Sequence, residues 1–313
     1  MPTNINDAGN SIFYKRELET IRSKTYDVLY PSPKLYNKLP KGTDGDELAV
    51  DITHRTYNRV GVAKMGGGDY STDFPRVDVF GVEHTVHVKP VQDSYGYSKD
   101  EIALAAREGK PLEFMRAKAA RTSIEDRLEI VAKTGDTATG LIGLFNQTGV
   151  TEYATPVGKT VSATTKFATK TADEILADLN GMIFAVQQGT NGVEEVDTIG
   201  LPMAQYNLIK TTRMSTLDGT TVLQYFKEQN PQITSIDWYS GLDTAAGAST
   251  SYTGTAMMIA WKNDADKLVF DLPLAFTQED EQIDGMAHTI PCRAKTAGVT
   301  VFYPKSIVYA KGI

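Results

Sequence analysis

Two short patterns in the sequence could belong to a nucleotide site or a metal site, and each lacks a required part. The stretch Val157-Gly158-Lys159-Thr160 contains the Gly-Lys-Thr end of a phosphate-binding loop, but Tyr153 stands where that loop needs its first glycine. His84 and His87 are an odd number of residues apart in a predicted strand, so their side chains point to opposite faces. We therefore expect no nucleotide hydrolysis, no bound metal and no other cofactor.

The other residues that could perform catalysis have simpler interpretations. His54 and His288 stand alone in the sequence, and no Gly-x-Ser-x-Gly motif of a serine nucleophile occurs. The acidic run from Gln278 to Asp284 lacks the turn glycine of a calcium loop, and we interpret it as a solvated loop. An α+β hydrolase would need convergent polar groups in a pocket, for which the sequence offers no candidate. We predict no catalytic residues and no enzymatic activity.

The composition is that of a soluble globular protein with 41% hydrophobic and 23% charged residues. Its 313 residues suggest about two domains. The densest apolar run, Ala256 to Trp261, is far shorter than the roughly 20 residues that cross a bilayer, and no signal peptide opens the chain. We expect no membrane association and a cytoplasmic place of synthesis. Cys292 is the single cysteine, so stability must come from packing.

The charge balance bears on nucleic acid as a partner. The formal net charge of -7 would repel a polyphosphate, so direct reading of a nucleic acid sequence is not expected. A mildly acidic surface would suit a protein that encloses nucleic acid without binding to it, although a net charge of this size is also routine for any soluble protein.

Residues 1–48 resemble an arm more than a domain, because Pro31, Pro33, Pro40 and Gly42 interrupt them. The arm is too apolar for a solvated tail, and we expect a neighbouring subunit to cover it because it lacks a local core. The alternative is a long loop lying on its own domain. The apolar residues of this arm are Ile12, Phe13, Leu18, Ile21, Tyr26, Val28, Leu29, Tyr30, Leu35 and Tyr36.

A hairpin is predicted next, with one strand around Val60 and Val62 and a second from Val77 to Val88. The valine spacing in the second strand changes phase after Val79, which predicts a bulge at Gly81. A two-stranded ribbon is marginal alone in water, so we expect its valine face to be buried by a neighbouring subunit. The proposed intersubunit contacts are Gly66, Gly67, Gly68, Asp69, Asp73, Arg76, Val79 and Val86.

Helices and strands alternate irregularly in the remainder, which predicts a mixed α+β fold. Capping boxes at Ser98/Glu101 and Thr171/Glu174 open helices, and prolines begin others at 111 and 202. The helix over 111–134 is long, with possible ion pairs Arg121/Glu125 and Glu129/Lys133, and Gly135 ends it. Another helix is predicted over 221–229, and strands are predicted over 233–238, 255–262, 268–270 and 299–308, with a break at Pro304.

Several local segments carry a family resemblance. Val131 to Asp136 leads to Gly140-Leu141-Ile142-Gly143-Leu144-Phe145-Asn146, and this follows the long helix. The further matching segments are 201–206, 222–226, 271–274, Arg293, 297–301 and 304–307. In this order they resemble the major capsid proteins of tailed bacteriophages with the Hong Kong 97 fold, which encapsulin shells share.

The resemblance implies a division of the whole chain. It assigns 1–48 to an N-terminal arm, 49–97 to an extended loop, 98–195 to a peripheral domain with a spine helix, 196–265 to an axial domain and 266–313 to returning strands. It also implies self-assembly through pentamers and hexamers into an icosahedral head around double-stranded DNA. Scaffold, portal and cement proteins are possible further partners, the virion is the expected location, and assembly would occur in the bacterial cytoplasm. An encapsulin-type shell is the alternative within the fold; an α+β hydrolase and a β-rich tail or adhesin protein come from other classes.

Overall fold

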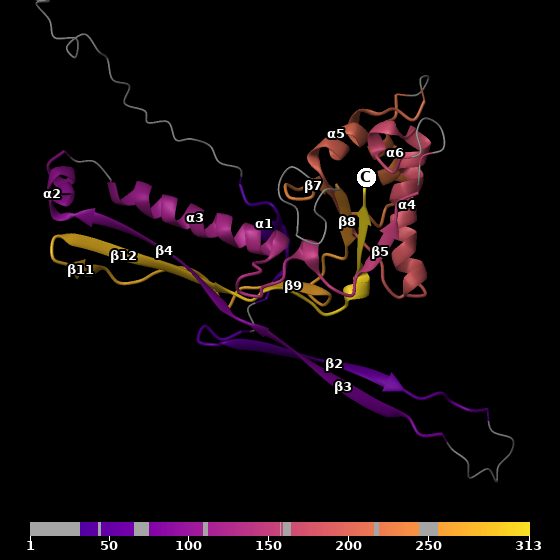
Figure 1. Ribbon diagram of the computed structural model, residues 1–313, viewed down its shortest axis with the longest axis horizontal. Helices are drawn as coiled ribbons and strands as arrows, with labels where there is room; N and C mark the ends of the chain where they lie inside the picture. The colour runs from indigo at the N-terminus through magenta and orange to yellow at the C-terminus, as the bar shows by residue number, and fades with distance from the viewer. Residues whose placement is uncertain are drawn as a thin grey trace, which may run out of the picture. The chain divides into compact units, whose positions relative to one another are not determined.

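The helices and strands of the computed structural model lie within the unit Pro33–Ile313 (Figure 1). The structure describes residues 32–42, 45–65, 75–108, 112–156, 158, 164–215, 219–243 and 256–313. The helices are α1 (Leu35–Lys38), α2 (Lys99–Glu108), α3 (Leu112–Thr134), α4 (Ala172–Gly189), α5 (Met203–Thr211) and α6 (Val222–Gln229). Short 3-10 turns are η2 (Leu144–Asn146), η3 (Phe167–Thr169) and η5 (Pro304–Ser306).

Fourteen strands are described, in four sheets. They are β1 (Lys41–Gly42), β2 (Asp51–Val60), β3 (Asp78–His87), β4 (Lys89–Ser98), β5 (Thr151–Ala154), β6 (Thr198–Leu201), β7 (Ser235–Trp238), β8 (Met257–Trp261), β9 (Leu268–Asp271), β10 (Leu274–Gln278), β11 (Gln282–Asp284), β12 (Ala287–Thr296), β13 (Gly298–Val301) and β14 (Ile307–Lys311). Their orders are β1-β9-β13, β10-β12-β11 with β4 also on β12, β5-β14-β8-β6-β7, and β2-β3.

The helix ends follow the predicted capping residues. The N–H of Glu101 donates to Ser98 Oγ and the N–H of Ser98 donates to Glu101 Oε2, at 3.2 and 3.1 Å. Thr171 and Glu174 make the same reciprocal pair before α4. Helix α3 ends at Gly135, whose φ of +70° suits glycine, and a Cβ there would lie 2.1 Å from the Leu141 carbonyl oxygen. These predictions are confirmed.

Helix α3 is amphipathic and packs its apolar face into the core. Ile124, Leu128 and Val131 are buried, each contributing about 1.5–3 kcal/mol of burial free energy. The two predicted ion pairs, Arg121–Glu125 and Glu129–Lys133, are both present, each at 2.8 Å. In Figure 1 the helix lies along β4 and β12, and its contacts with both strands explain how their shared sheet is covered.

The five-stranded sheet separates two apolar clusters. Along β8, Ile259 and Trp261 belong to the first cluster with α3, whereas Met258 and Ala260 belong to the second with α4, α5 and α6. Strand β14 alternates in the same way. Because successive strand residues face opposite sides, a sheet buried on both faces is apolar at every position. This explains the continuous run from Met257 to Trp261.

Part of the predicted arm belongs to the first cluster. Leu35 and Leu39 are buried there, and the N–H groups of Leu35 and Tyr36 donate to the Glu129 carboxylate at 3.2 and 2.7 Å. Strand β1 then pairs in parallel with β9. The expectation that the apolar residues of 1–48 lack a local core is therefore wrong for Leu35 and Tyr36. Residues 1–31 lie outside the described part of the chain.

The returning strands are organised largely as predicted. Strand β13 ends before Pro304, which begins η5, and β14 resumes at Ile307, so the expected break is confirmed. The acidic run is a correction. Strands β10 and β11 pair with successive parts of β12, so the run from Gln278 to Asp284 is interrupted strand, and only residues 279–281 lie outside both strands.

Candidate intersubunit surface

The predicted hairpin is a regular two-stranded ribbon formed by β2 and β3. The strands pair antiparallel from Asp51↔His87 to Val60↔Asp78 with no shift of register. The predicted bulge at Gly81 is therefore wrong. Gly81 lies opposite Tyr57, and a Cβ at Gly81 would lie 3.0 Å from Tyr57 Cε1. The glycine makes room for the tyrosine ring on the opposite strand.

One face of the ribbon carries polar side chains that pair across the two strands. We call it the odd face, because its residues have odd numbers on both strands. These pairs satisfy polar groups within the ribbon itself. They are Asp51–His87 at 2.5 Å, Thr53–Thr85 at 2.9 Å and Arg55–Glu83 at 2.7 Å.

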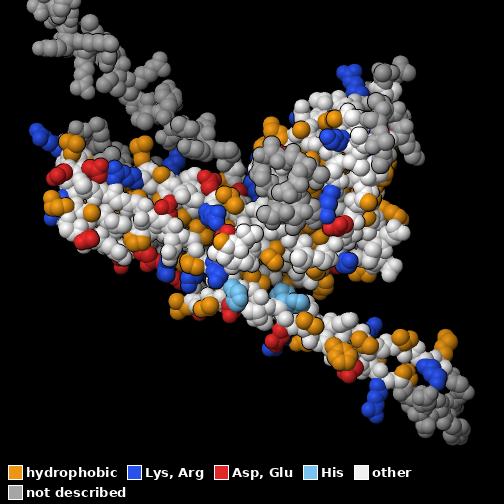
Figure 2. Space-filling model, viewed as in Figure 1, with side chains coloured by type: hydrophobic (Ala, Val, Ile, Leu, Met, Phe, Trp, Pro, Cys, Tyr) orange, Lys and Arg blue, Asp and Glu red, His pale blue; other side chains and the backbone are white. Residues whose placement is uncertain are grey.

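The outer part of the even face carries exposed apolar side chains. Val60, Phe80 and Val82 are 52%, 58% and 55% exposed. They lie opposite Asp78, Asn58 and Thr56, so polar side chains interrupt the apolar surface across the strands. Figure 2 shows hydrophobic side chains along this ribbon, and histidines on the same strands. The exposure of these three side chains makes the even face the candidate to contact another protein surface.

The inner part of the even face contacts the rest of the same chain. We call the described residues outside the β2–β3 ribbon the body. The His54 ring stacks on that of His84 with centroids 5.1 Å apart, and it meets the Phe302 ring edge to face at 5.0 Å. Ile52 and Pro273 both lie beside Gly45, each 3.0 Å from the position a Cβ would take there. No sequence pattern predicted that His54 lies beside His84, since only the strand register pairs them.

The predicted contact residues do not share one face. Val79 is exposed on the odd face, and Val86 is half-buried on the even face near the body. The expectation of a single valine face is wrong, because it depended on the bulge. Arg76 is described and exposed, whereas Gly66, Gly67, Gly68, Asp69 and Asp73 lie outside the described residues. Phe80 and Val82 were missed, although unbroken alternation along the strand would have identified them.

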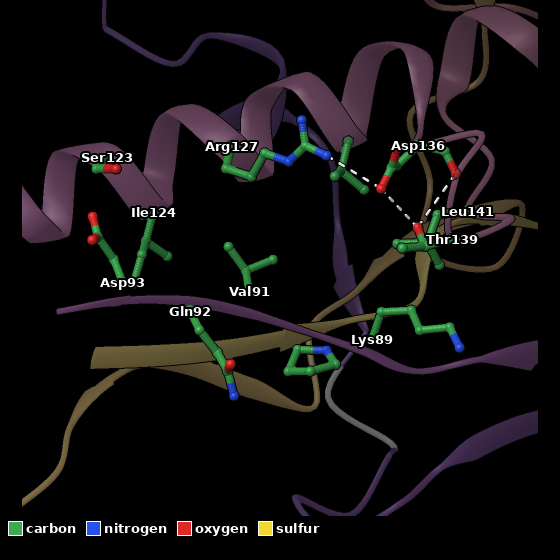
Figure 3. A pocket seen from close by; sticks show the side chains of 12 residues that line it. Lys89, Val91, Gln92, Asp93, Ser123, Ile124, Arg127, Asp136, Thr139 and Leu141 are labelled. Atoms are coloured by element: carbon green, nitrogen blue, oxygen red, sulfur yellow. Dashed lines mark hydrogen bonds and ion pairs between the residues drawn. The ribbon is translucent and has the colours of Figure 1, made fainter. Parts of the chain in front are cut away.

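The body contains a cavity of about 370 Å³ between β4 and α3 (Figure 3). Its apolar lining comes from Val91, Ile124, Val131 and Leu141. At one end, Arg127 pairs with Asp136 at 3.2 Å, and the Thr139 hydroxyl donates to the same carboxylate at 3.0 Å. These polar groups bind one another, so we interpret the cavity as a space left by the packing of α3 on β4. The other lining residues are Lys89, Pro90, Gln92, Asp93 and Ser123.

Shifted pKa values occur at structural pairs outside this cavity. Burial raises the pKa of Asp178 even though Lys170 pairs with it in the second cluster. Hydrogen bonds from Arg116 lower the pKa of Glu101 at the start of α2. Within the described residues, no three His, Cys, Asp or Glu side chains gather as a metal site would require. No described helix combines the length and the hydropathy needed to span a bilayer.

The sequence from residue 61 to residue 313 matches the family described as major capsid protein. The chain belongs to the major capsid protein family. A capsid protein is by definition a subunit of a virus shell, so the protein is a component of a virion shell. A shell subunit must contact its neighbours, so the exposed even face of the ribbon is a candidate for such a contact. A comparison with curated proteins finds no match.

Solved structures support the capsid fold. The capsid of Myoviridae phage XM1 matches with a TM-score of 0.78 at 17% identity, covering 97% of this chain and 99% of that one. Gordonia phage Cozz matches at 0.58 and 13%, covering 94% and 90%. The native GTA capsid matches at 0.58 and 10%, covering 99% and 98%. The α+β capsid fold expected from the resemblance is confirmed.

Proposed function

We propose that this capsid protein assembles through pentamers and hexamers into the icosahedral head of a tailed bacteriophage. The family match carries this proposal, together with the even face of the ribbon, whose apolar side chains have no cover within the described chain. In this proposal the head encloses double-stranded DNA without sequence-specific binding, consistent with the net charge of -7. The protein performs no catalysis, and scaffold, portal or cement proteins complete the head.

The two apolar clusters support a division into a peripheral and an axial domain. The first cluster joins α1, α3, β9 and β12, and we assign it to the peripheral domain. The second joins α4, α5, α6 and β6, and we assign it to the axial domain. In this assignment residues 172–189 join the axial domain, so the expected boundary at 195 moves to before α4. Within the expected axial range, Tyr239, Leu242, Ile259 and Trp261 pack in the first cluster.

The ribbon is the proposed clamp between subunits. Its inner even face is fixed to its own body at Phe302, so the outer even face is presented at a defined angle. Phe80 and Val82 would be buried by a second copy, since full burial of such side chains is worth about 1.5–3 kcal/mol each. Val86 and Arg76 remain proposed contacts at the two ends, and Gly66 to Asp73 remain proposed on sequence grounds alone.

Size-exclusion chromatography and negative-stain imaging of the purified full chain test this function. The expected product is a closed shell in the megadalton range. A stable monomer of 34.2 kDa would contradict assembly by this chain alone. Shells that contain a protein cargo in the native host, in place of DNA, would favour the encapsulin alternative.

A further inference from the structure

The place where the ribbon meets the body contains two titratable rings in direct contact. His54 and His84 are cross-strand partners, and their rings stack nearly parallel with an interplanar angle of 20°. The Phe302 ring meets His54 at 86°, which is the edge-to-face arrangement of aromatic pairs. Thr56 Oγ1 lies 3.4 Å from His84 Nε2. A histidine pair is thus built into the contact that holds the ribbon.

The charged groups of the ribbon do not neutralise this pair. Those adjacent in sequence lie on the odd face and bind one another across the strands. They are Asp51, Arg55, Glu83 and His87.

On the body side, the ring that contacts His54 is that of Phe302. Phe302 is uncharged, and its N–H donates to the Lys267 carbonyl oxygen at 2.9 Å. The Lys267 amine lies 4.3 Å above the Tyr303 ring and pairs with Glu194 at 2.7 Å. The ring contacts of His54 therefore offer no opposite charge to a protonated imidazole.

We propose that the His54–His84 stack against Phe302 is a pH-sensitive latch, which holds the ribbon to the body when His54 is neutral and releases it in acid. Burial and the neighbouring His84 lower the pKa of His54. Because the docked state disfavours the proton, the contact is fully present above the ordinary histidine pKa of about 6.5. The contact weakens as the pH falls below about 6.5, and it is lost once the pH lies below the lowered pKa of His54.

The consequence is a ribbon whose angle depends on pH. A proton on His54 would place a charge in a partly buried contact whose ring partners, His84 and Phe302, supply no opposite charge. Release would leave the β2–β3 pairing intact, since backbone hydrogen bonds between the strands hold it. The ribbon would then be free to move as a unit relative to the body. The base would then pivot near the bond from the Val88 N–H to the Val50 carbonyl oxygen, at 2.7 Å.

Hydrogen–deuterium exchange of the purified full chain at pH 7.5 and pH 5.5, corrected for intrinsic exchange, tests the latch. We expect protection of the peptides covering 50–57 and 299–304 to fall by at least about threefold in acid. His54→Phe, which keeps a ring but takes no proton, should remove this response. His87→Gln, on the odd face, is the matched control and should keep it.

Two results would overturn the latch. One is equal corrected protection of the unmodified chain at both pH values. The other is a full acid response in His54→Phe. Should that variant fail to fold, His84→Gln serves the same purpose, because it removes the ring that stacks on His54 while leaving His54 against Phe302. A full response in His84→Gln would likewise show that the pair is not the sensor.

Discussion

Two long antiparallel strand pairs in this molecule have the same length and opposite surroundings. Strands β4 and β12 pair over ten residues, as do β2 and β3. In the first pair, Cys292 and Ala294 are fully buried beneath α3. In the second pair, Phe80 and Val82 occupy corresponding positions on one face and are more than half exposed. The difference is the presence of a helix to cover the apolar face.

This difference indicates which parts of the subunit fold alone and which require assembly. A covered strand pair contributes to the stability of the monomer, whereas an uncovered one is marginal in water. The polar pairs on the odd face of the ribbon satisfy its charges without providing a core. We infer that the β4–β12 pair governs folding and that the outer β2–β3 pair governs association between copies. The predictions below test that division.

The largest effect should follow a charge placed under α3. Ala294→Asp would bury an unpaired carboxylate at a position with no exposed surface, at a cost of about 3–5 kcal/mol. Against the usual 5–15 kcal/mol of domain stability, we expect little soluble protein. The fraction of soluble chain after expression measures this. Lys295→Asp, on the opposite face of β12, is the matched control, and equal loss there would show that strand pairing alone is at fault.

The second effect should appear in assembly and leave folding unchanged. Phe80→Asp and Val82→Asp place charges on the exposed even face, so the monomer should fold while burial against a neighbour fails. We expect the yield of intact particles on a sucrose gradient to fall by at least about tenfold, which is the loss of about 1.4 kcal/mol per contact.

Val79→Asp is the control for that experiment, since it adds the same charge to the odd face. Its particle yield should stay within about twofold of the unmodified chain. A loss in Val79→Asp as large as that in Phe80→Asp would show that both faces are buried between subunits. Circular dichroism of each variant separates failed assembly from failed folding.

The elements of the covered region were predictable from sequence only in part. Helix α3 and the caps of α2 and α4 follow from local chemistry, because Ser98, Thr171 and Gly135 act on backbone groups a few residues away. Strands β4 and β12 were not predicted. Their sequences contain Pro90, Gly96 and Pro291, which weaken the strand pattern, and it is the long pairing beneath α3 that makes them strands.

The sequence predicted that the candidate surface is a two-stranded ribbon, but not which residues lie on each face of it. The phase change of the valines has two explanations, a bulge or apolar residues on both faces, and periodicity alone does not separate them. Likewise, His54 and His84 are thirty residues apart, so their contact depends on a register that only the folded strands define. The family resemblance supplied the architecture that local patterns lacked.

The third effect should be a partial loss of stability that leaves the chain folded, where α1 packs on α3, the helix that covers the first strand pair. Glu129→Ala removes the acceptor of two buried N–H groups, those of Leu35 and Tyr36. Each unsatisfied group costs about 1–3 kcal/mol, so we expect urea unfolding of dissociated subunits to show a loss of roughly 2–6 kcal/mol. Glu125→Ala breaks only the exposed pair with Arg121 and should cost about 0.5 kcal/mol. Equal losses of unfolding free energy in the two variants would mean that the hydrogen bonds between Glu129 and α1 add nothing to the stability of the subunit.

The smallest effect should come from the polar pairs of the ribbon. Arg55 and Glu83 are well exposed on the odd face, so their ion pair is worth about 0–1 kcal/mol. Arg55→Ala should therefore leave particle yield within about twofold of the unmodified chain, and added salt should not change that ratio, because water already screens the pair. If Arg55→Ala instead lowered the yield as strongly as Phe80→Asp, the odd face would be the buried one, since only desolvation between subunits could make so exposed a pair matter. The single substitution thus tests which face of the ribbon meets the neighbour.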